Sequence, residues 1–479
     1  MSEKRSFAKN YIFNLIYQIV AIALPLITTP YLSRVLGADS IGKYSFAQSI
    51  VSYFALFAAL GTTMYGQRLI ARASSNPSER SRLFLEVFLF RVVGAAVACL
   101  IYCLAIMPTS SDPILYAVAA IEIIAVAVDI TWFYQGMEDF QPIAMWNVVG
   151  KLLAIVGIFL FVKTRDDLVI YVALYCGSIL FGNLLAWLDL RKYLSRREPE
   201  DRRVSLPRHF MPALALFVSQ VAMQVYVVLD KTMIGIITGS DFENGYYEQS
   251  QKLSRVLVAV VTSLGVVMAS RVAVLWKENK KESVYSLIEG SFRFVFALGV
   301  PMAIGVTLVA SRFVPVFYGE GFEPVVGLIT ILAFMIPVIG CSNVIGIQLL
   351  VPTGREKLLT ASVAVGAVVN FLLNLGLIYF FASTGAAVAS LIAETAVTAT
   401  QFFFVRREIK IGRILKLLLR YSVFGAVMAA VGVGMSHIAP GGILGIAVIA
   451  LPCIAVYGGL LVVTKDPVFA FFKNRNKTE

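Results

Sequence analysis

Apolar runs long enough to cross a membrane recur along this whole sequence, and they restrict the chain to one class of fold. We predict fourteen of them. Each holds roughly 20 residues, the length with which an α-helix crosses about 30 Å of hydrocarbon. The backbone cannot leave polar groups unpaired in lipid, and the runs are too long and evenly apolar for barrel strands. The sequence therefore predicts an all-α membrane protein, in line with 58% hydrophobic and only 15% charged residues.

The first predicted span follows a short basic segment with Lys4, Arg5 and Lys9. It is full length and has no small-residue cleavage site, so we expect no cleavable signal peptide. The predicted spans cover residues 11–33, 43–64, 84–107, 114–135, 143–162, 169–188, 211–237, 246–273, 291–312, 325–350, 359–381, 386–405, 418–437 and 442–464.

The distribution of Lys and Arg predicts the orientation. With the N-terminus in the cytoplasm, the inside segments hold 29 basic residues and the outside loops hold five. Because basic residues gather in cytoplasmic loops, both termini are predicted to be cytoplasmic. Most of the net charge of +12 is then a topology signal. The basic residues are scattered over many loops, which argues against a nucleic-acid partner.

An internal duplication divides the chain. Gly37 and Asp39 recur as Gly239 and Asp241, 202 residues later. The residues that recur 203 positions later are Gly42, Tyr44 and Gln48, which match Gly245, Tyr247 and Gln251. Each copy joins one apolar run to the next, and duplications of this kind are typical of transporters that rock one half against the other.

The duplication predicts four regions. Residues 1–188 form a first six-helix bundle, 189–210 a charged cytoplasmic linker, and 211–405 a second six-helix bundle. Residues 406–479 add two helices without a repeat partner and a cytoplasmic tail. Each half has an even number of spans, so we expect parallel repeats related by an axis along the membrane normal.

Charged side chains inside spans are the first candidates for a transport site, because each costs about 2.5–3.5 kcal/mol to insert. Lys151 lies about 12 Å into its span at 1.5 Å per residue, with Asn147 one turn earlier on the same face. We predict that Lys151 faces a central cavity; the alternative is an ion pair with Asp129 or Glu122.

The spans that begin the second half carry two more polar stripes. Glu248, Lys252 and Arg255 share one face of a helix, and Arg255 lies deepest. The preceding span presents Gln220, Gln224 and Lys231 on one face. We predict a cationic, amide-rich cavity lining; the alternative for Lys231 and Lys252 is snorkelling at the outer interface.

Four further residues complete the candidate set. Arg34 at the outer end of the first span would hold substrate or cap its helix, and Arg91 would contribute a cation nearer the cytoplasm. Glu122 and Asp129 are seven residues apart and share a helix face. Two carboxylates at membrane depth can couple transport to Na⁺ or H⁺, or can instead pair with Lys151 or Arg91.

No nucleotide-binding fingerprint, zinc spacing or hydrolytic triad occurs in the sequence. We therefore expect no cofactor, no metal and no catalysis. Gly136-Met-Glu138 and Gly354-Arg-Glu356 occupy equivalent cytoplasmic loops, where we expect them to set the geometry of helix hairpins.

In its ordered motifs the chain resembles the Wzx-type lipid-linked oligosaccharide flippases, which belong to the same superfamily as multidrug and toxin extrusion exporters and lipid II flippases. The resembling segments are Asn14–Gln18, Pro25–Gly37, Trp132–Glu138, Leu229–Gly235, Tyr246–Gln249, Gly346–Pro352, Gly366–Asn370, Asn374 and Gly385–Glu394.

This resemblance implies a V-shaped pair of bundles around a central cavity in the bacterial inner membrane. It implies that the protein moves undecaprenyl-diphosphate-linked sugar units to the outer leaflet for O-antigen, capsule or exopolysaccharide synthesis. A polysaccharide polymerase and a chain-length regulator are the implied protein partners. Two alternatives stay open: a multidrug exporter of the related group, and a membrane polymerase or ligase for the same lipid-linked sugars.

Overall fold

All regular structure in the described part of the chain is helical. The computed structural model describes residues 2–195 and 204–468, without the side chains of 2–23, 219, 222, 223, 225 and 226. Within these residues, eleven helical segments are long and apolar enough to cross a membrane. The chain is therefore an all-α, multi-pass membrane protein, as predicted, while the number of fourteen spans stays a prediction.

The two longest of the eleven segments have 49 and 50 residues, about twice the length that one crossing needs. The helix α1 (Ser2–Ala59) contains non-helical backbone at Gly37, and α15 (Glu356–Val405) contains it at Ala382. Gly37 has a φ of +78°, a left-handed value that only glycine adopts at little cost. Both residues fall in predicted loops between apolar runs, so each long helix contains two of the predicted spans.

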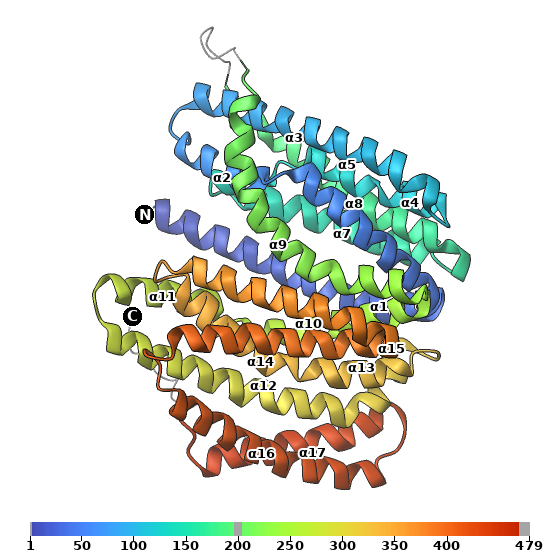
Figure 1. Cartoon of the computed structure of the whole chain (residues 1–479), viewed down its shortest axis with the longest axis vertical. Coiled ribbons are helices and arrows are strands. Elements are labelled where there is room, and N and C mark those ends of the chain that lie inside the picture. Colours follow the sequence, from blue (N-terminus) through green and yellow to red (C-terminus); the bar gives the residue numbers. More distant parts are fainter. Residues whose placement is uncertain (1, 196–203, 469–479) are drawn as a thin grey trace. The chain divides into compact units, whose positions relative to one another are not determined.

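The chain divides into two compact units, Met1–Thr232 and Met233–Glu479. In the first unit α1 packs against α3, α5 and α7, and α8 packs against α4, α5 and α7 (Figure 1). The bounds are α2 Thr62–Arg72, α3 Pro77–Ala105, α4 Pro113–Ala119, α5 Ile121–Val128, α6 Thr131–Gly136, α7 Gln141–Phe161, α8 Leu168–Leu190 and α9 Pro207–Thr238, with single 3₁₀ turns at Met107–Thr109 and Arg165–Asp167.

The second unit is built around α12, which packs against α13, α14, α16 and α17 (Figure 1). Its C-terminal pair, α16 and α17, also pack against each other. The bounds are α10 Asp241–Thr262, α11 Gly265–Lys277, α12 Lys281–Tyr318, α13 Pro324–Ala333, α14 Met335–Ile345, a π-helical turn Gly346–Leu350, α16 Ile411–Ile438 and α17 Gly442–Val463.

Large apolar side chains lie exposed on the helix surfaces. Leu104 is 70% exposed, Phe380 is 73% exposed and Val463 is 81% exposed. In water such surfaces would drive association, whereas in a bilayer they lie in their preferred solvent. The exposed residues therefore mark the faces that contact lipid.

In both units a side-chain contact connects the turn after the fourth predicted span of that half with the segment after its sixth predicted span. Glu138 and Gly354 have left-handed backbone, and the next residue makes the tie in each case. Asp139 accepts a hydrogen bond from the Tyr193 hydroxyl, and Arg355 pairs with Glu408 at 2.5 Å. These contacts support the interpretation that the two Gly-x-Glu segments set hairpin geometry.

Candidate functional site

A broken helix forms the centre of the candidate site in the first unit. The predicted fourth span consists of α4, α5 and α6, and Asp129 and Ile130 between α5 and α6 are not helical. A helix that ends leaves its last carbonyls without backbone partners. Inside a membrane such groups need other donors, since an unpaired one costs several kcal/mol.

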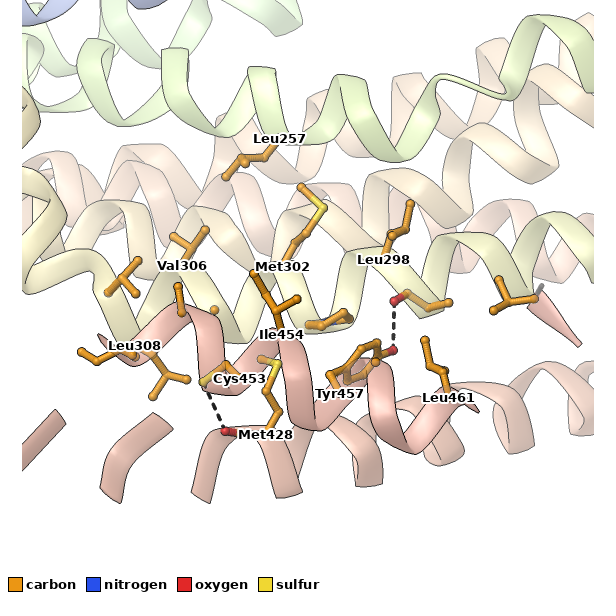
Figure 2. Close-up of a pocket in the computed structure, with 18 of the residues that line it drawn as sticks. Leu257, Leu298, Met302, Val306, Leu308, Met428, Cys453, Ile454, Tyr457 and Leu461 are labelled. Atoms are coloured by element: carbon orange, nitrogen blue, oxygen red, sulfur yellow. Dashed lines mark hydrogen bonds between the residues drawn. The ribbon is translucent and has the colours of Figure 1, made fainter. Parts of the chain in front are cut away.

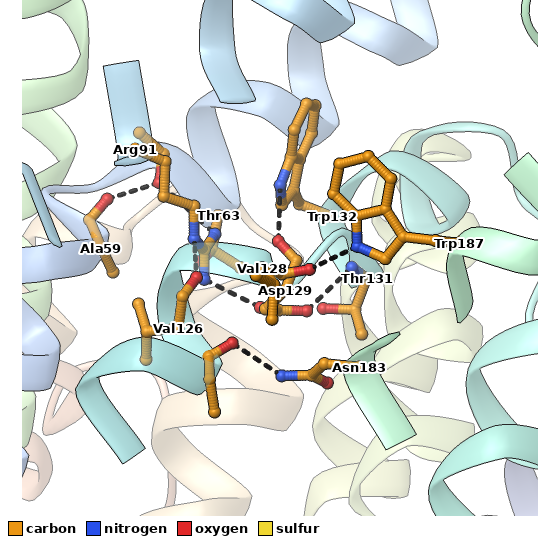
Figure 3. A network of polar contacts seen from close by, with 12 residues as sticks. Ala59, Thr63, Arg91, Val126, Val128, Asp129, Thr131, Trp132, Asn183 and Trp187 are labelled. Atoms are coloured by element: carbon orange, nitrogen blue, oxygen red, sulfur yellow. Dashed lines mark hydrogen bonds and ion pairs between the residues drawn. The ribbon is translucent and has the colours of Figure 1, made fainter. Parts of the chain in front are cut away.

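Side chains from two other helices supply those donors (Figure 3). Asn183 of α8 donates its Nδ2 to the Ala125 carbonyl at 2.9 Å, and Trp187 of α8 donates its indole N–H to Val128 at 2.8 Å. Arg91 of α3 donates its Nε to the Val126 carbonyl at 2.6 Å. The break is thus stabilised by tertiary contacts rather than by local sequence.

Arg91 does more than satisfy one carbonyl. Its guanidinium pairs with Asp129 at 2.8 Å and lies 3.4 Å and 3.3 Å from the hydroxyls of Thr62 and Thr63. The side chain is 2% exposed. A cation at the C-terminal end of α5 also interacts favourably with the helix dipole. Asp129 in turn accepts the Thr131 N–H at 2.9 Å, at the start of α6.

A polar pocket of about 290 Å³ opens beside the break. Oxygen-bearing side chains of three kinds are among its lining residues: carboxylates, amides and a hydroxyl. Asn147 and Asn183 each donate the amide nitrogen to a helix carbonyl, which leaves the amide oxygen for another partner. The lining residues are Glu122, Ala125, Val126, Asp129, Thr131, Gln135, Ile143, Asn147, Ile179 and Asn183.

The structure brings three of the predicted site residues together in this pocket: Glu122, Asp129 and Asn147. Glu122 hydrogen-bonds to Gln48, a residue of the internal repeat. Lys151 is half-buried on α7, one turn beyond Asn147, and is not among the lining residues.

The other predicted substrate contacts lie elsewhere. Arg34 is exposed on α1 and donates to the Pro30 carbonyl at 2.7 Å, the helix-capping alternative that its position suggested. On α9, three half-buried side chains belong to the first unit: Gln220, Gln224 and Lys231.

In the second unit the polar stripe of α10 is present as predicted. Lys252 pairs with Glu248 at 3.2 Å, and Arg255 Nη2 donates a hydrogen bond to Gln251 Oε1 at 2.8 Å. Arg255 is exposed. That Arg255 and Lys151 face one cavity stays a prediction.

A second buried polar cluster lies between α10 and α15. The Tyr247 hydroxyl is 3.1 Å from the Ser390 hydroxyl, and Asn370 donates to the same hydroxyl at 3.4 Å. Asn374 donates to Asn370 at 3.1 Å, one helical turn away. All four side chains are at most 5% exposed. Tyr247 repeats Tyr44, so the duplicated motif lies against buried polar groups in the second unit.

An apolar cavity of about 570 Å³ lies between α12, α16 and α17 (Figure 2). Its lining includes Met302 of α12, Met428 of α16, Ile454 of α17 and Leu257 of α10. The Tyr457 hydroxyl is turned to the Ala297 carbonyl at 2.9 Å. Such a lining suits a hydrocarbon chain and offers almost nothing to a sugar or a diphosphate.

Sequence reasoning missed Asn183, Gln135 and Trp187. Asn183 was detectable, because it is a lone amide within the apolar run 169–188 and such residues in a span need partners. Trp187 gave no signal, since indoles are common near the ends of spans. Among the described residues, no group of three His, Cys, Asp or Glu side chains is placed to hold a metal ion.

The fold and the polar groups held inside its spans define a polytopic membrane transporter. The model of the polysaccharide biosynthesis protein family matches residues 7–270, more than half of the chain, so the chain belongs to that family. It is 23% identical to a protein of Escherichia coli (strain K12) described as an O-antigen transporter, over 85% of this chain and 98% of that protein. It is 22% identical to the lipid II flippase MurJ of Bacillus subtilis (strain 168), over 67% of this chain and 64% of that one.

Solved structures show the same fold. An inward closed conformation of the lipid II flippase MurJ has a TM-score of 0.74 at 14% identity, over 98% of this chain and all of that one. An outward-facing multidrug resistance transporter of the MATE family and MOP superfamily has a TM-score of 0.56, over 86% of this chain and 96% of that one. Together with the family match, these comparisons confirm the resemblance to Wzx-type flippases.

We predict that Arg91→Ala destabilises the protein, because the half-buried Asp129 loses its partner and the Val126 carbonyl loses its donor. Removing one member of a fully buried pair costs about 3–5 kcal/mol, and we expect a smaller loss here because Asp129 borders the polar pocket. Thermal unfolding of detergent-purified protein would measure the loss. Arg68→Ala, at an exposed position of α2, is the matched control and should unfold like the wild type. Wild-type stability of Arg91→Ala together with lost transport would show instead that Arg91 acts on the substrate.

Proposed function

We propose that this protein is a flippase that moves an undecaprenyl-diphosphate-linked oligosaccharide from the inner to the outer leaflet of the bacterial cytoplasmic membrane. The observation that carries the proposal is the match to an O-antigen transporter over 98% of that relative's length. The family and the flippase fold agree with it. The named relatives are transporters and flippases, so we infer transport rather than polymerase or ligase chemistry.

The residues suit such a cargo. A diphosphate needs cations at membrane depth, and sugar hydroxyls need polar partners. Lys151 lies half-buried on α7, and Arg255 is exposed on α10 with the Gln251 amide beside its guanidinium. Burying an unpaired diphosphate in hydrocarbon would cost many kcal/mol, so the head group would cross through an aqueous cationic cavity. The multidrug-exporter alternative is less suited, because a cationic cargo favours an acidic lining.

Deletion of the native O-antigen transporter from a suitable host gives the primary test. Expression of this protein should restore surface glycan and remove the accumulated lipid-linked intermediate. Supply of a series of lipid-linked sugars would identify the substrate. Failure with every lipid-linked sugar, combined with extrusion of cationic dyes, would favour the exporter alternative. In this pathway a polymerase and a chain-length regulator would act on the flipped product. The proposed orientation places both termini of the chain in the cytoplasm.

We predict that Lys151→Ala and Arg255→Ala each reduce surface glycan while protein abundance stays near wild type. The reason is that each removes a cation proposed to contact the diphosphate, and neither side chain belongs to the buried core. Immunoblots of glycan and of the protein would measure both quantities. Lys192→Ala, which removes a 72% exposed cytoplasmic lysine, is the control. Normal glycan in the double variant would contradict the proposed lining.

The polar pocket of the first unit is proposed as the coupling-ion site, for Na⁺ or H⁺. Asp129 already compensates Arg91, so Glu122 would carry the change in charge and the amide oxygens of Asn147 and Asn183 would complete an oxygen-rich site. Glu122→Gln keeps the size and polarity of the side chain but removes its charge.

We predict that Glu122→Gln abolishes the dependence of flipping on an ion gradient. Proteoliposomes with a fluorescent lipid-linked sugar, under a sodium or a pH gradient, would measure flipping and identify the ion. Glu79→Gln, at the cytoplasmic start of α3, is the control. Gradient dependence that survives in Glu122→Gln would place the coupling site elsewhere.

The lipid tail is proposed to stay in the bilayer and to pass through a side opening between the first span, within α1, and the eighth, α10. Cysteine pairs placed along these two helices and joined by a cross-linker should block flipping, and reduction should restore it. The control is a cysteine pair within the first unit, joined in the same way. Flipping at full rate through a locked opening would refute this route.

A further inference from the structure

The cytoplasmic end of α9 is attached to α3 through one buried carboxylate. Glu86 of α3 is 0% exposed. Its Oε1 accepts the Ser205 N–H at 3.0 Å, and its Oε2 accepts hydrogen bonds from Arg208 and from His209 Nε2, the latter at 3.0 Å. Three donors from the residues at the start of α9 therefore converge on one anion.

His209 extends the attachment to α2. The Tyr65 hydroxyl lies 2.9 Å from His209 Nδ1, and the two rings meet edge to face. Burial lowers the pKa of the imidazole, so the neutral ring predominates at cytoplasmic pH. With the proton on Nε2, that nitrogen donates to Glu86 and the Tyr65 hydroxyl donates to Nδ1, while Arg208 Nε lies 3.3 Å from Nε2. Every polar atom of the ring then has a partner.

One to two turns after His209, the backbone of α9 packs directly against the backbone at Gly61, between α1 and α2. Gly61 has a left-handed φ of +73°, and a Cβ at this position would lie 2.2 Å from the Ala213 carbonyl oxygen and 2.9 Å from the Phe217 nitrogen. The ring of Phe217 also packs on Phe57 of α1, with centroids 5.2 Å apart. Only glycine permits this approach.

The other described end of the linker is attached to the same helix. Arg80 donates to the Tyr193 carbonyl, with Nε at 3.0 Å, and the Ser195 N–H donates to the Ser81 hydroxyl at 3.0 Å. Arg80 and Ser81 precede Glu86 on α3 by six and five residues. The two described ends of the linker therefore both contact α3.

We propose that Glu86 is a permanent anchor that keeps the cytoplasmic end of α9, residues 207–217, part of the first unit throughout the transport cycle. Opening the cluster would expose a buried carboxylate and separate it from three donors at once, which is costly. The described ends of the linker, residues 189–195 and 204–210, are then both fixed to the first unit. The proposal rests on the proposed function only in assuming that a transport cycle exists.

Distances between spin labels on α2 and α9 would test the anchor without any transport assay. The labels go on Ala71→Cys and Met211→Cys, both exposed positions, in a background where Cys99 and Cys103 are replaced by serine because the other three cysteines are buried. We expect one narrow distance distribution that does not change with pH, sodium or added lipid-linked sugar. A second distance population under any of these conditions would overturn the proposal.

Variants of the cluster show whether Glu86 is the cause. Glu86→Gln should broaden the distribution, because the anion that gathers the donors is lost, whereas Glu79→Gln on the same helix should not. An unchanged distribution in Glu86→Gln would refute the assignment. Should Glu86→Gln fail to fold, His209→Leu and His209→Gln replace it: the first should broaden the distribution and the second, which retains an N–H donor, should restore it. Equal behaviour of these two variants would exclude the hydrogen bond as the cause.

Glycan assembly in the complemented host keeps the two proposals separate. Complementation by the wild type with a mobile α9 end would leave the flippase proposal intact and refute the anchor. A rigid α9 end without complementation by any lipid-linked sugar would refute the flippase proposal alone.

Discussion

A carbonyl that ends a helix inside a membrane has no water to bind, and this constraint organises the first unit. The chain interrupts its fourth predicted span at Asp129 and Ile130, which exposes the carbonyls of α5. Donors then have to come from α3 and α8, and Arg91, Asn183 and Trp187 provide them. The polar pocket is a consequence, because an amide that donates its nitrogen to the backbone keeps its oxygen for something else.

The charged residues inside the spans differ in how far neighbouring groups of the protein compensate their charge. Arg91 and Asp129 neutralise each other at 2.8 Å and hold a helix end in place. Lys252 pairs with Glu248 along α10, so its charge is also partly compensated. Arg255 stands one turn beyond Lys252, with an exposed guanidinium beside Gln251. A transporter of a diphosphate needs cations that carboxylates of the protein have not already neutralised. By this criterion Arg255 is a better candidate than Arg91 or Lys252.

The all-α membrane class could be predicted from sequence, because the length of the apolar runs matches the thickness of the membrane. The shared helix face of Glu122 and Asp129 follows from their seven-residue spacing, and both residues line one pocket. The partner of Asp129 could not be chosen from sequence, since Lys151 and Arg91 were both plausible and only the packing of α3 against α5 decides for Arg91. The break in the helix could not be predicted from the sequence, because the predicted span 114–135 that contains Asp129 and Ile130 has no glycine or proline. Gln48 and Tyr247 of the duplicated motif both contact polar groups, and the spacing of the motif does not identify those groups.

The broken helix has a consequence for how the protein is made. The donors to Ala125 and Val128 stand 58 and 59 residues later in the chain. When the fourth span leaves the ribosome and enters the bilayer, Asn183 and Trp187 have not yet been inserted. Until the sixth span arrives, the interrupted segment has to remain next to the insertion machinery, where water or protein can satisfy its carbonyls, or to cross as an unbroken helix that rearranges afterwards. The order of synthesis is thereby part of the folding problem, and a nascent chain truncated before α8 lacks the groups that stabilise the native break.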